Sequence, residues 1–333
     1  MSISTPDYQK NGFLDEKSWE FPNIINLNVL RGICPCRCIH CPIGLTQIDK
    51  RIEYFGEDTI EFSLYKKIVD EIAFQGKKGL LRIHSVGEPL LWNSLPEAVR
   101  YSKGKDVKTW IFTSAYTEDM RLLEILCENI DIIEVSVNST TREDYLTTKG
   151  IDGFPVVTAA INYMTAYIQK YSLSTRLICS RVETKQQLID DQFVEYWKNV
   201  PGIADAFVRS YHNYNGLLKD NGLLNGCLSE KHLSPCLVHW GRFNIDIDGT
   251  AVICFNELFK KNRSRDIILG NVITDSIESI WKSEKMNKLR RFLLGLSDER
   301  VGTIPCINCA TCQEYPPKVP TSEVQIKALE NKK

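Results

Sequence analysis

Two groups of cysteines stand near opposite ends of this chain of 333 residues. The first group comprises Cys34, Cys38 and Cys41, with a fourth thiol, Cys36, between them. The second group is spread over the last third of the chain and comprises Cys236, Cys254, Cys306, Cys309 and Cys312. Thiols grouped in this way usually bind metal ions or iron–sulfur clusters, whereas disulfide frameworks belong to oxidising compartments. The spacing therefore predicts two separate metal sites.

The composition gives no sign of a secreted, membrane-bound or nucleic-acid-binding protein. The first 17 residues are polar and mixed in charge, without the apolar segment of a signal peptide. Lys and Arg (41) nearly balance Asp and Glu (42), so no overall field attracts nucleic acid or an anionic membrane. No apolar run approaches the length of a membrane span. We expect a cytoplasmic protein with no nucleic-acid partner and no membrane partner.

Short apolar runs and helical patterns alternate over residues 24–210. The period of the apolar residues predicts strands at 25–29, 80–84, 108–113, 132–137, 175–179 and 206–209. Helical spacing separates them, at 62–75, 95–102, 118–128, 156–170 and 186–198. Six strands that alternate with helices predict a parallel α/β architecture, either an open barrel or a doubly wound sheet.

The pattern changes after residue 211. Residues 243–254 form two alternating runs around Asp248-Gly249, which predicts a β-hairpin. Residues 276–294 have the apolar spacing of an amphipathic helix. A stretch rich in Asn, Gly and Leu precedes the hairpin, and a charged tail follows the last cysteines. The C-terminal part therefore predicts a small hairpin-plus-helix domain.

The first cysteine group follows directly on the first predicted strand. Parallel β/α folds place their active sites at the carboxyl ends of strands, where this loop would lie. Iron–sulfur clusters are usually held by four cysteines. Three thiolates from Cys34, Cys38 and Cys41 would leave one iron open to another ligand. The alternative is a zinc knuckle built on Cys38 and Cys41, with Cys34 or Cys36 added.

The spacing Cys-x3-Cys-x2-Cys after a first strand resembles the signature of the radical S-adenosylmethionine (SAM) superfamily. The resemblance implies that a [4Fe-4S] cluster binds SAM through its open iron and, once reduced, cleaves SAM to a 5′-deoxyadenosyl radical that abstracts hydrogen from a substrate. It also implies a reducing partner such as flavodoxin or ferredoxin, and a partial (β/α)6 barrel. The chain departs from the family pattern at Cys36, an extra thiol, and at His40, where an aromatic residue is usual.

Further segments resemble the SAM-binding positions of the same family. Gly87-Glu88-Pro89 follows the second strand where the family has Gly-Gly-Glu-Pro, with Val86 in place of the first glycine. The resemblance implies that backbone carbonyls and Glu88 bind the methionine ammonium. It implies that the ribose and the carboxylate of SAM meet the residues Ser136, Asn138 and Lys149.

The second cysteine group resembles the SPASM and twitch domains of radical SAM enzymes. Cys236 is followed by twelve residues, Gly249, four residues and Cys254, as at the start of those domains. The resemblance is greatest to the twitch domain of a radical SAM aminocyclitol dehydrogenase of butirosin biosynthesis. It implies an auxiliary [4Fe-4S] cluster on Cys236, Cys254, Cys306 and Cys309, with Cys312 able to replace one of the last two. A zinc ribbon is the alternative.

These resemblances divide the chain and suggest a reaction. We expect a lead (1–22), a radical SAM core (23–215), a bridge (216–235), an auxiliary-cluster domain (236–320) and a tail (321–333). Only 33 residues precede Cys34, which leaves little room for a leader-peptide-binding domain and favours a sugar or cyclitol as substrate. We expect dehydrogenation of an alcohol, with the auxiliary cluster as electron acceptor. The alternatives are an epimerase or cross-linking reaction, with Cys227 or Cys179 as hydrogen donor in an epimerase, a peptide-modifying enzyme, and a metal-binding module without catalysis.

Overall fold

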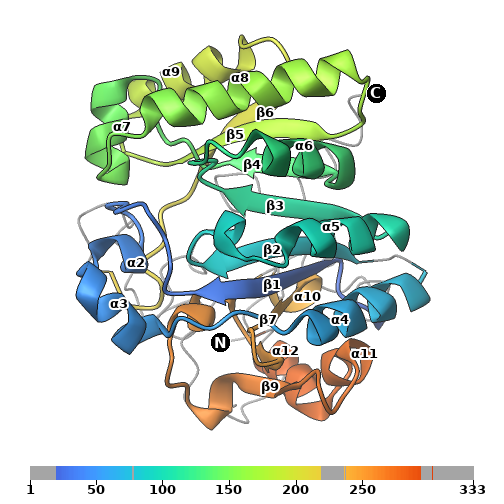
Figure 1. Ribbon diagram of the computed structural model, residues 1–333. Helices are drawn as coiled ribbons and strands as arrows, with labels where there is room; N and C mark the ends of the chain where they lie inside the picture. The colour runs from blue at the N-terminus through green and yellow to red at the C-terminus, as the bar shows by residue number, and fades with distance from the viewer. Residues whose placement is uncertain (1–19, 77–78, 219–235, 237, 294–301, 303–333) are drawn as a thin grey trace, which may run out of the picture.

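The computed structural model describes residues 20–76, 79–218, 236, 238–293 and 302 (Figure 1). Within these residues nine strands form one sheet, in the order β6-β5-β4-β3-β2-β1-β7-β8-β9. No helix in the described part of the chain is long and apolar enough to cross a membrane.

The core is a sheet of parallel strands that follow one another in chain order, as in an open barrel. Its strands are β1 (Ile24–Arg31), β2 (Leu80–Val86), β3 (Thr109–Thr113), β4 (Ile132–Val135), β5 (Arg176–Val182) and β6 (Ile203–Arg209). Each strand pairs in parallel with the next. The order has no reversal point, which distinguishes a partial barrel from a doubly wound sheet. The predicted α/β fold is therefore confirmed, and it is the barrel form.

Helices cover one face of this sheet. They are α4 (Phe62–Phe74), α5 (Leu95–Gly104), α6 (Met120–Asn129), α8 (Phe154–Lys170) and α9 (Gln187–Lys198) (Figure 1). Alternate strand residues such as Val29, Ile83 and Val135 are fully buried in the core cluster that these helices share. Side chains alternate along a strand. The residues between them therefore point to the opposite, inner face of the partial barrel.

Shorter elements lie at the strand ends. After β1 come α2 (Pro42–Leu45) and α3 (Ile48–Phe55); after β2 comes the 3-10 turn η2 (Pro89–Leu91); after β4 comes α7 (Arg142–Lys149). The N-cap of α7 is Thr141, whose hydroxyl accepts from the backbone N–H of Asp144 at 3.2 Å. Gly150 ends α7 in the left-handed conformation, with φ 66°. These connections bring several loops together at the carboxyl ends of β1, β2 and β4.

The C-terminal region extends the same sheet. It contains α10 (Val238–Gly241), β7 (Arg242–Ile245), β8 (Thr250–Val252), η3 (Phe255–Phe259), η4 (Arg265–Ile267), β9 (Ile268–Asn271), α11 (Ile277–Trp281) and α12 (Glu284–Leu293). β7 pairs in parallel with β1, and β7, β8 and β9 pair antiparallel in turn. The hairpin predicted around Asp248-Gly249 is confirmed, and Gly249 has the positive φ of 79° that such a turn requires.

The single helix predicted over 276–294 is wrong in one respect, because it is divided into α11 and α12. The backbone N–H of Ser283 bonds to the carbonyl of Ile280 at 3.2 Å, which tightens the end of α11. The hydroxyl of Ser283 then accepts from the N–H of Met286 at 3.3 Å and starts α12. Serine competes for backbone partners in this way, and apolar spacing alone does not reveal it.

A buried ionic network joins the core to the C-terminal region. The carboxylate of Asp246, just after β7, accepts from Nη1 of Arg31 at 2.7 Å and also pairs with Arg263. Asn28 on β1 donates to the same carboxylate at 2.6 Å. Arg31 also donates to the carbonyl oxygen of Leu258 at 2.8 Å. The end of β1 is therefore fixed to the hairpin just before the first cysteine group begins.

Candidate active site

The first cysteine group occupies the loop of residues 32–41, between β1 and α2. We call this segment the cluster loop. Cys34, Cys38 and Cys41 are half-buried, and Cys36 is buried. The thiols of Cys34 and Cys38 each contact the thiol of Cys36. Within the described residues, no three His, Cys, Asp or Glu side chains already surround a single metal position. Four thiols from one loop nevertheless form a donor set that suits iron–sulfur or zinc ligation.

Burial affects how these thiols ionise. Desolvation raises the pKa of Cys41 to about 11, against the opposing effect of nearby backbone N–H groups. Thiolates, not thiols, are metal ligands. The loop therefore has to lose protons when it binds a metal, so its metal affinity should rise with pH.

The end of α7 holds the cluster loop through its backbone. The N–H of Arg37 donates to the carbonyl of Lys149 at 2.7 Å, and the N–H of Ile39 donates to the carbonyl of Thr148 at 3.1 Å. A Cβ on Gly150 would lie 2.8 Å from the carbonyl oxygen of Arg37. Only glycine fits this approach and this positive φ together.

Arg51 on α3 also binds the cluster loop, and sequence reasoning did not find it. Its guanidinium donates to the carbonyl oxygens of Cys34 at 2.6 Å and Cys36 at 3.1 Å. The side chain is only 4% exposed. No motif marks this arginine, because α3 reads as a short polar helix.

The segment Gly87-Glu88-Pro89 lies directly against the cluster loop. The N–H of Glu88 donates to the carbonyl of Ile33 at 2.8 Å. A Cβ on Gly87 would approach that carbonyl oxygen to 2.4 Å, so the position requires glycine. The cluster loop and the Gly-Glu-Pro segment are thus in direct contact.

The carboxylate of Glu88 is fully used within the protein. One oxygen accepts from the Thr113 hydroxyl at 2.6 Å and from the N–H of Leu90 at 3.2 Å. The other accepts from the N–H of Ser114 at 2.8 Å and from its hydroxyl at 2.6 Å. A carboxylate offers about four acceptor sites. The side chain therefore ties the Gly-Glu-Pro segment to the end of β3.

The three residues expected near the carboxylate and ribose of SAM lie together. The amide of Asn138 donates to the hydroxyl of Ser136 at 2.9 Å, and the ammonium of Lys149 reaches the same hydroxyl at 3.5 Å. Asn138 has a φ of 62° and accepts from the N–H of Val182 at 2.7 Å, which links β4 to β5. Burial would lower the pKa of Lys149, but the neighbouring thiols of the cluster loop, Cys38 foremost, outweigh it and raise that pKa.

The inner face of the sheet carries cationic and aromatic side chains. The His84 ring stacks on Phe112 at a centroid distance of 4.1 Å. The guanidinium of Arg82 lies 4.4 Å from the centre of the same phenyl ring. Arg209 binds both oxygens of Glu134, at 2.6 and 2.5 Å. Burial lowers the pKa of His84, with Arg82 and Arg209 adding to the effect, so this imidazole is neutral at physiological pH.

Cys179 does not reach this inner face, which corrects its assignment as a hydrogen donor. The strand predicted to end at Cys179 continues to Val182, because its ladder with β6 extends to the pair Val182 and Arg209. The Cys179 side chain is fully buried in the core cluster shared with the helices. Cys127 is buried in the same cluster and packs against it. Cys227, the other donor expected, lies outside the described residues.

Two cysteines of the second group are described. Cys254 follows β8 and immediately precedes η3, and Cys236 precedes α10, where its carbonyl accepts from the N–H of His239 at 3.1 Å. Both thiols are half-buried. Phe255, the neighbour of Cys254, lies against the His84 ring at 4.7 Å. The segment that carries Cys254 therefore touches the inner face of the core. Cys306, Cys309 and Cys312 lie outside the described residues.

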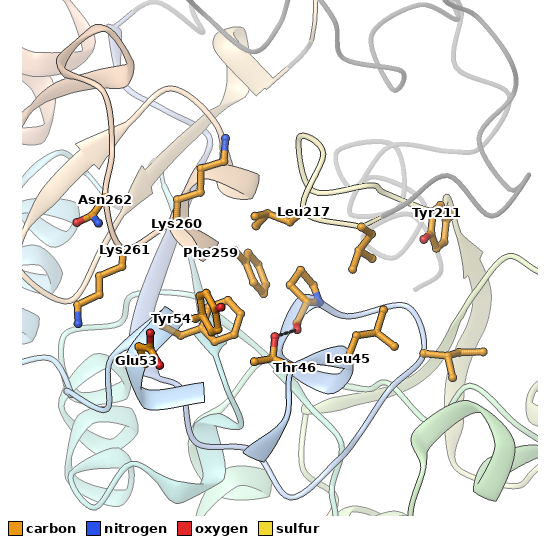
Figure 2. A pocket seen from close by; sticks show the side chains of 14 residues that line it. Leu45, Thr46, Glu53, Tyr54, Tyr211, Leu217, Phe259, Lys260, Lys261 and Asn262 are labelled. Carbon is orange, nitrogen blue, oxygen red and sulfur yellow. Dashed lines mark hydrogen bonds between the residues drawn. The ribbon is translucent and has the colours of Figure 1, made fainter. Parts of the chain in front are cut away.

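A cavity of about 660 Å³ opens beside the cluster loop (Figure 2). One wall comes from α2 and α3, with Pro42 next to Cys41 and with Tyr54. The opposite wall comes from Phe259 and Lys260 at the end of η3, and Leu217 closes a third side. The cavity thus lies between the cluster loop and the end of η3, which also pack against each other, and most of its lining side chains are apolar or aromatic.

The partial barrel of residues 24–209 has the fold of solved radical SAM enzymes. Residues 236–313 match the family model SPASM, an iron–sulfur cluster-binding domain. The chain therefore combines a radical SAM fold with a C-terminal SPASM domain. Both were expected from the sequence, and both are confirmed.

Solved structures with this fold include three radical SAM enzymes. BtrN in complex with AdoMet and 2-DOIA is 17% identical, with a TM-score of 0.53, and the match covers 89% of this chain and 96% of BtrN. SuiB of Streptococcus suis bound to S-adenosylmethionine is 14% identical, with a TM-score of 0.60, over 82% of this chain and 68% of SuiB. Native anSMEcpe with bound AdoMet is 14% identical, with a TM-score of 0.59, over 92% and 98%. No curated protein matches the chain by sequence.

Proposed function

We propose that this protein is a radical SAM enzyme that abstracts hydrogen from its substrate. The observation that carries the proposal is the contact between four elements at one end of the barrel. The cluster loop is hydrogen-bonded to the Gly87-Glu88 segment, to the end of α7 and to α3. A zinc knuckle would account for the thiols but not for the Gly-Glu-Pro segment and Lys149 packed beside them.

Cys34, Cys38 and Cys41 are the residues that would hold the catalytic [4Fe-4S] cluster and leave one iron open. Cluster and SAM together would supply a 5′-deoxyadenosyl radical, after one electron from a donor such as flavodoxin or ferredoxin. The protein's own contribution is binding and orientation. Lys149 would place its buried positive charge opposite the SAM carboxylate. Backbone carbonyls of the segment around Gly87 would accept from the SAM ammonium, with Glu88 fixing that segment.

Dehydrogenation of an alcohol is the reaction that we favour. It requires an electron acceptor near the inner face, and the segment carrying Cys254 touches His84 there. Cys236, Cys254 and two of Cys306, Cys309 and Cys312 would hold an auxiliary [4Fe-4S] cluster in that role. Epimerisation requires a thiol that faces the substrate, and Cys179 faces the helices instead. BtrN, which has this fold, was crystallised with 2-DOIA, and we propose a sugar or cyclitol as substrate here.

Modification of a peptide is the second candidate function. The apolar and aromatic cavity beside the cluster loop favours it, because such walls suit amino-acid side chains better than a polyhydroxylated ring. SuiB was crystallised with the precursor peptide SuiA.

Anaerobic reconstitution tests the proposal at the level of cofactors. The wild-type chain should bind roughly eight irons, the content of two four-iron clusters, and form 5′-deoxyadenosine from SAM when dithionite is added. Cys34→Ala, Cys38→Ala and Cys41→Ala should each abolish this cleavage, whereas Cys36→Ala should retain it. Four irons plus one zinc would overturn the auxiliary cluster, and an inactive Cys36→Ala beside an active Cys34→Ala would overturn the ligand assignment.

Turnover in deuterated water distinguishes the reactions. A product that lacks two hydrogen atoms by mass spectrometry would support dehydrogenation. A product that gains one deuterium, and no longer does so in Cys227→Ala, would establish an epimerase instead. Substrates for the assay should include aminocyclitols, sugars and short peptides.

A further inference from the structure

We propose that Arg51 is a positioning residue for the catalytic cluster: it fixes the shape of the cluster loop, and its charge stabilises the reduced cluster. This inference rests on the proposed function, because it assumes that Cys34, Cys38 and Cys41 hold that cluster. Nothing in the family resemblance assigns a role to this position.

The contacts of Arg51 are directed entirely at the backbone around the thiols. Nη1 donates to the carbonyl of Cys34 at 2.6 Å and Nη2 donates to the carbonyl of Cys36 at 3.1 Å. Nε donates to the carbonyl of Thr46 at 3.3 Å, beyond the other end of the loop and α2. One planar guanidinium thus joins the start, the middle and the exit of the segment that carries every cysteine of the group. A flexible ammonium cannot match this fixed geometry.

Among the described residues, no carboxylate neutralises the positive charge of Arg51. No Asp or Glu in the described part of the chain forms an ion pair with it, and the side chain is only 4% exposed. Arginine keeps its charge in proteins. Because water screens a buried charge poorly, we expect its field to reach the neighbouring thiolates.

A nearby cation favours the reduced state of an iron–sulfur cluster. The cluster and its three thiolates gain one negative charge on reduction, and the potential depends on net charge and hydrogen bonding. Lys149 approaches the same thiols from α7, and Arg51 approaches the loop from α3. Lys149 would be partly neutralised by the SAM carboxylate under the proposed function, whereas Arg51 would remain a permanent charge. Arg51 is therefore the residue whose removal should change the potential both with and without SAM.

Three variants test the inference on the reconstituted full chain. Arg51→Gln removes the charge, and Arg51→Lys keeps the charge but loses the planar guanidinium with its several donors. Lys50→Gln is the matched control, because Lys50 is the preceding residue on α3, is 51% exposed and pairs with Glu53 alone among the described residues. Iron and sulfide content, the SAM-dependent EPR signal of the reduced cluster and its potential in a dithionite titration are measured. Only a cluster with an open iron responds to SAM, so the signal distinguishes it from the auxiliary cluster.

The expected results distinguish the effect of the Arg51 charge from its effect on the conformation of the cluster loop. Arg51→Gln should lower the reduced-to-oxidised ratio of the SAM-responsive cluster about tenfold at a fixed poise, equivalent to about 59 mV for one electron. Arg51→Lys should show a smaller decrease, together with an altered EPR line shape, and Lys50→Gln should match the wild type. Full iron content with unchanged potential and EPR signal in Arg51→Gln would overturn the inference. So would a loss of iron in Arg51→Gln and Arg51→Lys alike, with the loaded fraction titrating as wild type. A wild-type chain that shows no SAM-responsive signal would instead overturn the proposed function.

Discussion

The buried network around Asp246 gives a quantitative prediction about what joins the two parts of the chain. The change is Asp246→Asn, which keeps the volume but removes the charge between Arg31 and Arg263. In both ion pairs the partners are at most 7% exposed. Removal of one partner from a buried pair typically costs about 3–5 kcal/mol. With a urea dependence of about 3 kcal/mol per M, the unfolding midpoint should fall by about 1–1.7 M.

The assay is anaerobic urea unfolding, followed by circular dichroism in the far ultraviolet. Asp152→Asn is the control, because Asp152 forms the same kind of pair with Arg142 at the surface, where the side chains are 48% and 61% exposed. A surface pair contributes about 0–1 kcal/mol, so this midpoint should fall by less than about 0.3 M. Equal shifts in the two variants would refute the conclusion that the buried network holds β7 against β1.

The pH dependence of the stability difference between wild type and Asp246→Asn gives an independent check. Burial on its own would raise the pKa of Asp246, but the charges of Arg31 and Arg263 outweigh burial and lower it from its ordinary value of 3.8. A carboxylate with a lowered pKa stabilises the fold above its unfolded pKa and loses this effect as pH falls through the folded value. The difference between wild type and Asp246→Asn should therefore be constant at neutral pH and should shrink only below 3.8.

Three further predictions concern the site. Gly150→Ala should cost about 1–2 kcal/mol of stability, because its backbone is left-handed. It should also lower iron retention, because the new Cβ would meet Arg37. The control is Gly76→Ala, which has a similar φ of 71° and no neighbour within 4 Å, and which should cost stability but keep iron. Glu88→Gln should lose about 1.5–3 kcal/mol of stability, the value of a hydrogen bond to a charged group. The variant should also bind SAM more weakly in a titration, while its iron content is unchanged. Unaltered stability would contradict the hydrogen bonds of the Glu88 carboxylate. Cys179→Ala should retain turnover on the natural substrate, and a loss of deuterium incorporation in this variant would show that its thiol does reach the substrate.

The fold was predictable from the sequence because its signals are local. Apolar alternation identified the core strands, and the Asp248-Gly249 turn identified the hairpin. The pairing of β7 with β1 was not predictable, since it joins residues more than 200 positions apart, such as Ile24 and Arg242. Pairing over that distance is decided by the packing of the whole molecule and leaves no periodicity in either strand.

The site was predictable where a motif exists and not where a single side chain acts at a distance. Ser136, Asn138 and Lys149 were expected together and do lie together. The hydroxyl groups that bind Glu88 come from the last residue of β3 and from Ser114 just after it, and no spacing rule connects them with Glu88. Arg51 has no signature at all, because its partners are backbone carbonyls that every residue possesses.

The position of β7 beside β1 has a consequence for the two parts of the chain when they are separated. β1 is buried along its whole length, and without β7 its backbone groups from Ile24 to Leu27 would lose their partners on that edge. An uncovered strand edge presents unpaired N–H and C=O groups, which recruit strands from other molecules. A cut between residues 216 and 235 should therefore give an aggregating core instead of a truncated enzyme. The hairpin therefore protects the edge of β1. Loss of the auxiliary cysteines should be tolerated far better than loss of β7.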